Sequence, residues 1–150
     1  VNTNWNPNII LFSGQSKHQK YLLELGKTVS GRTGVVTNFK LILNKENDKP
    51  LRRTEQVVRN EVFTDLGIFA RQLKVENIYQ GITTIASTFG FSGVEPNTVM
   101  MGWPKGLESS KEYAKMTETL LHLDYNLLYL ICSEIPNKYI IITVWCSSLN

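Results

Sequence analysis

Short strand-like runs alternate with stretches of helical periodicity along nearly the whole chain, and this alternation limits the folds open to it. The runs have the length and composition of β-strands, most of them buried. They are residues 8–13, 35–43, 67–74, 98–101, 127–132 and 139–145. Because parallel strands need a right-handed crossover between them, strand–helix alternation predicts a mostly parallel sheet between two layers of helices. We expect an α/β fold with five or six strands and helices on both faces.

Four segments between these strands carry apolar residues at helical spacing. Ser16 with Gln19, and Ser109 with Glu112, have the spacing of a capping box at a helix start. The expected core positions are Leu22, Leu25 and Val29; Thr54, Val58, Val62 and Leu66; Val75, Ile78, Ile82, Ile85, Ala86 and Phe89; and Tyr113, Met116, Leu120 and Leu123. We expect each of these four helices to pack its apolar face on the sheet.

Length and composition are those of one domain, because 150 residues that are 42% hydrophobic can form a single core. The net charge of +3 comes from 16 basic and 13 acidic residues that are interspersed, so we expect no nucleic-acid partner. The basic cluster Arg52, Arg53 and Arg59 is interpreted as a solvated helix face. No apolar stretch reaches the roughly 18 residues of a membrane helix. The chain begins at Val1 without a secretory leader, and we interpret it as a piece of a longer protein.

The cysteines and histidines indicate neither a metal site nor a catalytic site. Cys132 and Cys146 lie in or beside apolar runs, as buried reduced thiols of a cytosolic protein do, with a disulfide as the alternative. Neither His18 nor His122 has metal-ligand spacing from them, and both are expected on helix surfaces. His122 and Asp124 would point in different directions on one helix. We therefore expect no catalytic residues and no enzyme activity.

The most distinctive segment is residues 96–104, Pro-Asn-Thr-Val-Met-Met-Gly-Trp-Pro. A buried type of strand stops at Gly102, where glycine would let the backbone turn sharply, and a Trp-Pro pair opens the next loop. Ligands of open parallel sheets bind at the carboxyl ends of the strands, so this strand end is a candidate ligand site. The segment is only moderately specific by itself, because every doubly wound sheet has several such strand ends.

Three segments of the chain together resemble the cytosolic C-terminal domain of cation-chloride cotransporters. Asn4-Trp5-Asn6-Pro7 resembles the family's Asn-Trp-Arg-Pro-like lead-in to the first strand, and residues 96–104 resemble its Asn-Thr-Val-Leu-Val-Gly-Trp-Pro-like strand. Residues 142–145 resemble the Ile-Asp-Val-Trp-Trp run that begins the second half of that domain. Asn6 and Cys146 depart from the pattern, since the family has Arg and Trp there. These departures suggest a distant, prokaryotic member.

The resemblance implies that residues 1–150 are the first half of that domain, with a lead-in at 1–7 and the start of the second half at 138–150. It implies a transporter that moves sodium or potassium with chloride through a separate membrane domain, while this part serves assembly, trafficking and regulation at the cytoplasmic side of the membrane. The implied partners are its own membrane domain and a second protomer. The family's C-terminal halves resemble universal stress proteins, whose fold is Rossmann-like. The alternative is therefore a freestanding nucleotide-binding protein of the universal stress type.

Universal stress proteins bind ATP at the strand ends, so the resemblance also implies a candidate site for an adenine nucleotide. The phosphate-binding residues would be Gly102, Trp103, Lys105, Gly106 and Ser109, because N–H groups at a helix start and a lysine attract anions. The sugar and base would be flanked by Ser13, Gly14 and Leu41. However, the glycine spacing differs from the stress-protein signature, and Ser13 stands where an acidic residue is often found. A purely structural turn remains the alternative.

Overall fold

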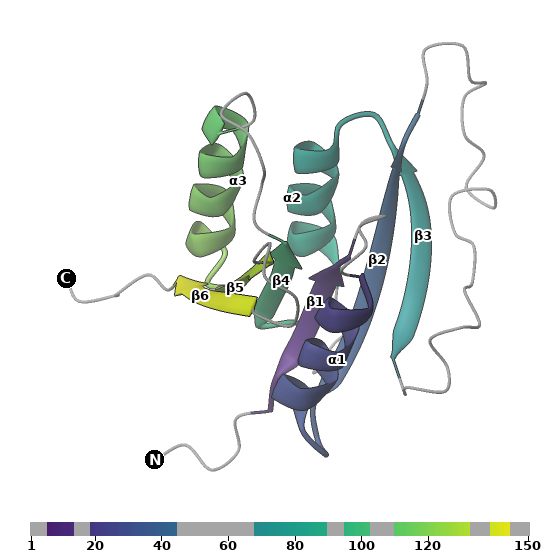
Figure 1. Cartoon of the computed structure of the whole chain (residues 1–150). Helices are drawn as coiled ribbons and strands as arrows, with labels where there is room; N and C mark the ends of the chain where they lie inside the picture. The colour runs from purple at the N-terminus through teal and green to yellow at the C-terminus, as the bar shows by residue number, and fades with distance from the viewer. Residues whose placement is uncertain are drawn as a thin grey trace.

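The computed structural model describes residues 6–13, 19–44, 68–89, 95–102, 110–132 and 139–144. These ranges contain six strands and three helices (Figure 1). The strands are β1 (Asn8–Phe12), β2 (Val35–Leu43), β3 (Phe69–Val75), β4 (Thr98–Gly102), β5 (Asn126–Cys132) and β6 (Tyr139–Val144). The helices are α1 (Gln19–Ser30), α2 (Ile78–Thr88) and α3 (Ser110–His122).

All six strands form one sheet in the order β3-β2-β1-β4-β5-β6. The first five strands in this order run parallel to one another, and β6 pairs antiparallel with β5. The expected α/β fold with a mostly parallel sheet is confirmed. The predicted bounds of β2 agree with the structure, and those of the other strands agree to within two residues.

Both faces of the sheet are covered by helices, and β1 lies in the middle (Figure 1). Ile9 and Leu11 of β1 belong to the apolar cluster that α1 joins on one face. Ile10 and Phe12 alternate with them and belong to the cluster that α2 and α3 join on the other face. Because successive residues of a strand point to opposite faces, a strand covered on both sides carries apolar residues on both faces, as residues 9–12 do.

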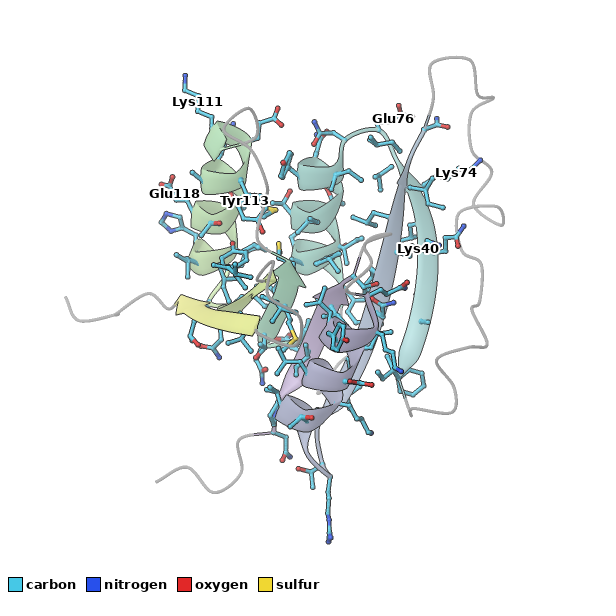
Figure 2. All side chains as sticks on the ribbon, in the orientation of Figure 1. Lys40, Lys74, Glu76, Lys111, Tyr113 and Glu118 are labelled. Carbon is cyan, nitrogen blue, oxygen red and sulfur yellow. The ribbon has the colours of Figure 1, made fainter. Side chains whose placement is uncertain are left out.

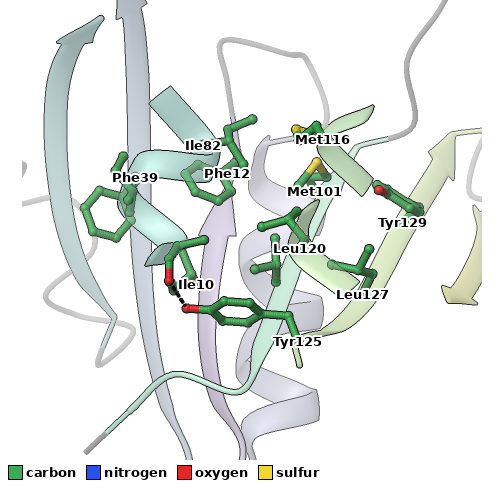
Figure 3. Close-up of a cluster of buried hydrophobic side chains, with 13 residues drawn as sticks. Ile10, Phe12, Phe39, Ile82, Met101, Met116, Leu120, Tyr125, Leu127 and Tyr129 are labelled. Atoms are coloured by element: carbon green, nitrogen blue, oxygen red, sulfur yellow. Dashed lines mark hydrogen bonds between the residues drawn. The ribbon is translucent and has the colours of Figure 1, made fainter. Parts of the chain in front are cut away.

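The larger of these two clusters lies between the sheet, α2 and α3 (Figure 3). Ile82 from α2, and Met116 and Leu120 from α3, pack on the sheet residues of this cluster. The Tyr125 hydroxyl donates a buried hydrogen bond to the Ala86 carbonyl oxygen, which ties the start of β5 to α2. Burial, with a smaller effect of Glu95, raises the pKa of Tyr125 to about 12, so this hydroxyl keeps its proton.

Helix α1 packs on the sheet through Leu22, and Leu25 contacts the same apolar cluster, as expected, but Val29 does not join them. The buried residues of the helix are Leu22, Leu23, Gly26 and Ser30, whereas Val29 is 37% exposed. Gly26 also faces the sheet, where an added Cβ would lie 3.5 Å from Cγ1 of Val36, at ordinary contact distance. The buried positions Leu22, Leu23, Gly26 and Ser30 lie on the side of the helix toward the sheet, and Val29 lies outside this set.

Two further expectations about core positions were wrong. Val75 is the last residue of β3, not part of a helix, and α2 starts after Asn77, whose Oδ1 accepts a hydrogen bond from the Gln80 N–H at 3.1 Å. This side chain satisfies one of the N–H groups at the helix start. Leu123 is 41% exposed because α3 ends at His122 and the chain turns through Asp124, whose φ is 63°. The helix expected over residues 51–66 lies outside the described residues.

Candidate functional site

From β1 the chain continues to β2 and β3 on one side of the sheet, whereas from β4 it continues to β5 on the other side. The strand order therefore reverses between β1 and β4. In open parallel sheets, ligands bind at the carboxyl ends of the strands at this point. Phe12 pairs with Met101, so Ser13 and Gly102 follow opposite each other at the candidate site. The structure thus brings together two residues that were predicted to share a site.

Ser13 lies at the end of β1 and is 3% exposed. Its Oγ accepts a hydrogen bond from Nε2 of Gln19, the first residue of α1, at 3.3 Å. The bond connects the end of the strand to the start of the helix that follows. A hydroxyl oxygen has a second lone pair, and its proton can also be donated, so this bond leaves Ser13 some hydrogen-bonding capacity.

Gly102 is the last residue of β4, and the turn expected after it falls on residues 103–109, outside the described residues. Among the described glycines, Gly31 alone has a φ in the left-handed region. An added Cβ at Gly102 would have no heavy atom within 4 Å. The backbone at the end of β4 is therefore exposed, and open space lies on the side where a side chain would project.

A cluster of tyrosines holds the end of β4. The Tyr113 hydroxyl of α3 donates to the Gly102 carbonyl oxygen at 2.7 Å. The Tyr113 ring packs edge-on against Tyr79 of α2, with centroids 5.9 Å apart, and lies 5.4 Å from the ring of Tyr129. Figure 2 shows Tyr113 on the side of α3 that faces α2. Burial, then the neighbouring Tyr129 and Tyr79, raise the pKa of Tyr113, so it remains a neutral donor.

Sequence patterns did not point to this cluster as part of the site. Tyr113 was expected only as one apolar position of a helix. The sequence does place a tyrosine in each of three neighbouring elements, α2, α3 and β5. Whether these tyrosines contact one another depends on how α2 and α3 pack, which the sequence pattern does not show. The cluster fixes the Gly102 carbonyl oxygen at the end of β4.

Leu41, predicted to flank the nucleotide, contacts the apolar core. It is half-buried on β2 and packs against the larger apolar cluster. Its neighbour in that cluster, Phe39, is 2% exposed and meets the ring of Phe89 edge-on at 5.1 Å. Leu41 therefore serves the core on the α2 side. Five further predicted site residues lie outside the described residues: Gly14, Trp103, Lys105, Gly106 and Ser109.

Metal-ligating side chains do not gather in the described part of the chain. No group of three His, Cys, Asp or Glu residues there could hold a metal ion. His122 lies on the surface as expected, with its side chain 80% exposed and its Nε2 3.9 Å from the Glu118 carboxylate. Among the described helices, none is long and apolar enough to cross a membrane.

At the opposite, amino edge of the sheet, two segments that carry the cotransporter resemblance contact each other. Nδ2 of Asn97, at the start of the distinctive strand, donates to the Asn6 carbonyl oxygen at 2.9 Å. Oδ1 of Asn97 accepts from the Asn8 N–H at 3.1 Å. The lead-in and β4 are 91 residues apart in sequence and form one structural unit.

The chain has the architecture of a doubly wound α/β domain, with strand order 3-2-1-4-5 in its parallel part. No family model matches it, and no curated protein does. Among solved structures, it is similar to the cytoplasmic domain of a prokaryotic cation chloride cotransporter, with a TM-score of 0.57 and 15% identity. The similarity covers 87% of this chain and 48% of that one, so this chain spans about half of the solved domain. At this identity the similarity shows a shared fold.

Proposed function

We propose that this chain is part of the cytoplasmic domain of a cation-chloride cotransporter and acts there in assembly and regulation, without chemistry of its own. The observation that carries the proposal is the structural similarity over 87% of the chain to such a domain. The contact between Asn6 and Asn97 supports it, because two segments with cotransporter-like sequence form one structural unit. Its partners would be the membrane domain of the same protein and a second protomer.

The complete coding sequence tests this proposal at once. We expect several apolar stretches of about 20 residues upstream of Val1, each long enough to span a membrane. We also expect a second α/β half downstream of Asn150. An initiator methionine directly before Val1 would contradict the proposal, and would favour a freestanding protein of the universal stress type.

A second candidate function is binding of an adenine nucleotide at the carboxyl edge of the sheet. Ser13 and Gly102 lie opposite each other there, and the space beside Gly102 is open. The exposed end of β4 allows a ligand to approach the backbone closely. Lys105 and Ser109 follow β4 in the sequence and would supply a positive charge and a helix-start hydroxyl for the phosphates.

Nucleotide binding predicts a rise in thermal midpoint when ATP is added to the purified chain. A ligand at 100 times its Kd stabilises the native state by about 2.7 kcal/mol, which is a shift of several degrees for a domain of this size. Lys105→Ala should reduce the shift without changing the midpoint of the free protein. If millimolar ATP leaves the thermal midpoint of the native sequence unchanged, nucleotide binding at this edge is excluded.

A further inference from the structure

We propose that the side-chain hydrogen bonds of Asn97 act as a latch, which holds the lead-in residues Asn6 and Pro7 on the sheet. While the bond from Asn97 to Asn6 is formed, the latch is closed, and Asn6 and Pro7 move as one body with the amino edge of the sheet. When it is open, Asn6 is left with its hydrogen bond to Thr33, and Asn6 and Pro7 become mobile while the domain stays folded. Asn97 would thus be a positioning residue that sets the direction in which the upstream chain leaves the domain.

The side chain of Asn97 bonds to three residues at once. Its Nδ2 donates to the Asn6 carbonyl oxygen at 2.9 Å, while its Oδ1 accepts from the Asn8 N–H at 3.1 Å and from the Thr98 hydroxyl at 2.8 Å. The Asn97 backbone bonds to two strands as well, donating to the Asn8 carbonyl oxygen and accepting from the Asn126 N–H. One asparagine therefore connects the lead-in, β1, β4 and β5.

The turn between α1 and β2 holds the lead-in from its other side. The Thr33 hydroxyl donates to Oδ1 of Asn6 at 2.8 Å. The Val35 N–H donates to the Pro7 carbonyl oxygen at 2.9 Å, which extends the β1–β2 ladder by one bond. Asn6 is thus held between two elements, with one hydrogen bond to each.

The contacts that hold the lead-in are polar and lie near the surface. Asn6 is exposed and Pro7 half-buried, and neither belongs to an apolar cluster of the sheet. In contrast, the β1 residues that follow are fully buried. Segments that bury little apolar surface open at a small fraction of the global unfolding free energy. The lead-in can therefore separate from the sheet without disturbing the core.

The use of this joint rests on the proposed function, but its existence does not. If a membrane domain precedes this chain, a movement of that domain would be transmitted through the closed latch to β1 and β4. The latch itself can be measured in the chain of 150 residues alone. A failure of the latch therefore leaves the cotransporter proposal intact, and a missing membrane domain leaves the latch intact.

Asn97→Asp is the variant that opens the latch selectively. The carboxylate keeps an oxygen for the Asn8 N–H and the Thr98 hydroxyl, but it replaces the donor that faces the Asn6 carbonyl with an acceptor. The readout is nitrogen relaxation of the Asn6 amide by NMR. We expect an order parameter near 0.85 in the native chain, as in rigid backbone, and below about 0.6 in the variant. Thr33→Val, which removes only the hydroxyl bond, should lower it by less.

Amide hydrogen exchange separates a latch from a general structural role. In Asn97→Asp we expect the Val35 amide to exchange about tenfold faster, because its acceptor on Pro7 becomes mobile. The amides of Gly81 and Phe89 in and after α2 should keep their protection. Protonation of the new carboxyl below about pH 4 restores a donor and should reorder Asn6. An Asn6 amide that is flexible in the native chain, an unchanged order parameter in the variant, or lost protection in α2 would each overturn the proposal.

Discussion

Leu120→Ala is expected to lower the free energy of unfolding by about 4 kcal/mol, since buried Leu→Ala changes cost 2–5 kcal/mol. Leu120 is 0% exposed and lies between α3 and the sheet, in the same cluster as Met116, Tyr125 and Leu127 (Figure 3). Its neighbours come from different elements, so the cavity left by the truncation cannot collapse by moving one side chain. Urea unfolding followed by circular dichroism measures the loss.

Leu123→Ala is the matched control, because it is the same substitution three residues further along the chain. Leu123 is 41% exposed in the turn after α3, and substitutions at exposed positions usually change stability by about 0.5 kcal/mol or less. We expect its unfolding midpoint to stay close to that of the native protein. Equal losses for both variants would contradict the packing of α3 on the sheet.

Gly34→Ala is expected to destabilise the protein by about 3 kcal/mol. Gly34 follows α1 in the turn that leads into β2, where its N–H donates to the Ser30 carbonyl oxygen at 2.9 Å. An added Cβ would lie 2.2 Å from that same oxygen and 2.7 Å from Cα of Ser30. Because the clash is with backbone, α1 or the start of β2 must shift. Thermal unfolding of the purified variant measures the cost.

Gly102→Ala tests whether this effect is specific to Gly34. An added Cβ at Gly102 meets no heavy atom within 4 Å, and its backbone φ is not in the left-handed region. We expect a change of less than about 1 kcal/mol. A larger loss at Gly102 than at Gly34 would show that the end of β4, and not the turn after α1, is the sterically constrained position.

The fold was predictable because the pattern of apolar residues carries most of the information about it. β1 and β4 are apolar on both faces, and β2 was located to the residue although it includes Asn38, which is 1% exposed. Alternation with helices then leaves few topologies, since parallel crossovers are right-handed. The parallel sheet was expected, whereas its strand order, 3-2-1-4-5, was not predicted.

The orientation of α1 could be predicted only in part, because it depends on contacts between elements. Leu22 and Leu25 contact the cluster as expected, but Val29 is exposed, and Leu23, Gly26 and Ser30 are buried in addition. Periodicity shows which helix residues are apolar. It does not show which of them face the sheet once the helix has packed. The start of α2 was missed for a related reason, since the Asn77 cap is a stronger signal than the apolar Val75 before it.

The candidate site was partly predictable. Ser13 and Gly102 were expected together from their positions after two strands, and the register of β1 and β4 confirms their proximity. Tyr113 and Asn97 were not predicted as site or joint residues, because their hydrogen bonds to Gly102 and Asn6 follow from tertiary packing. The nucleotide itself stays a prediction, since Lys105 and Ser109 lie outside the described residues.

The most direct test of the central proposal is ion uptake by the complete protein in lipid vesicles. We expect uptake of labelled sodium or rubidium that depends on chloride, and a strong reduction when the segment corresponding to residues 1–150 is deleted. Chloride-dependent uptake that is lost with this segment would establish its role in the transporter. Uptake that is indifferent to chloride, or unaffected by the deletion, would contradict the proposal.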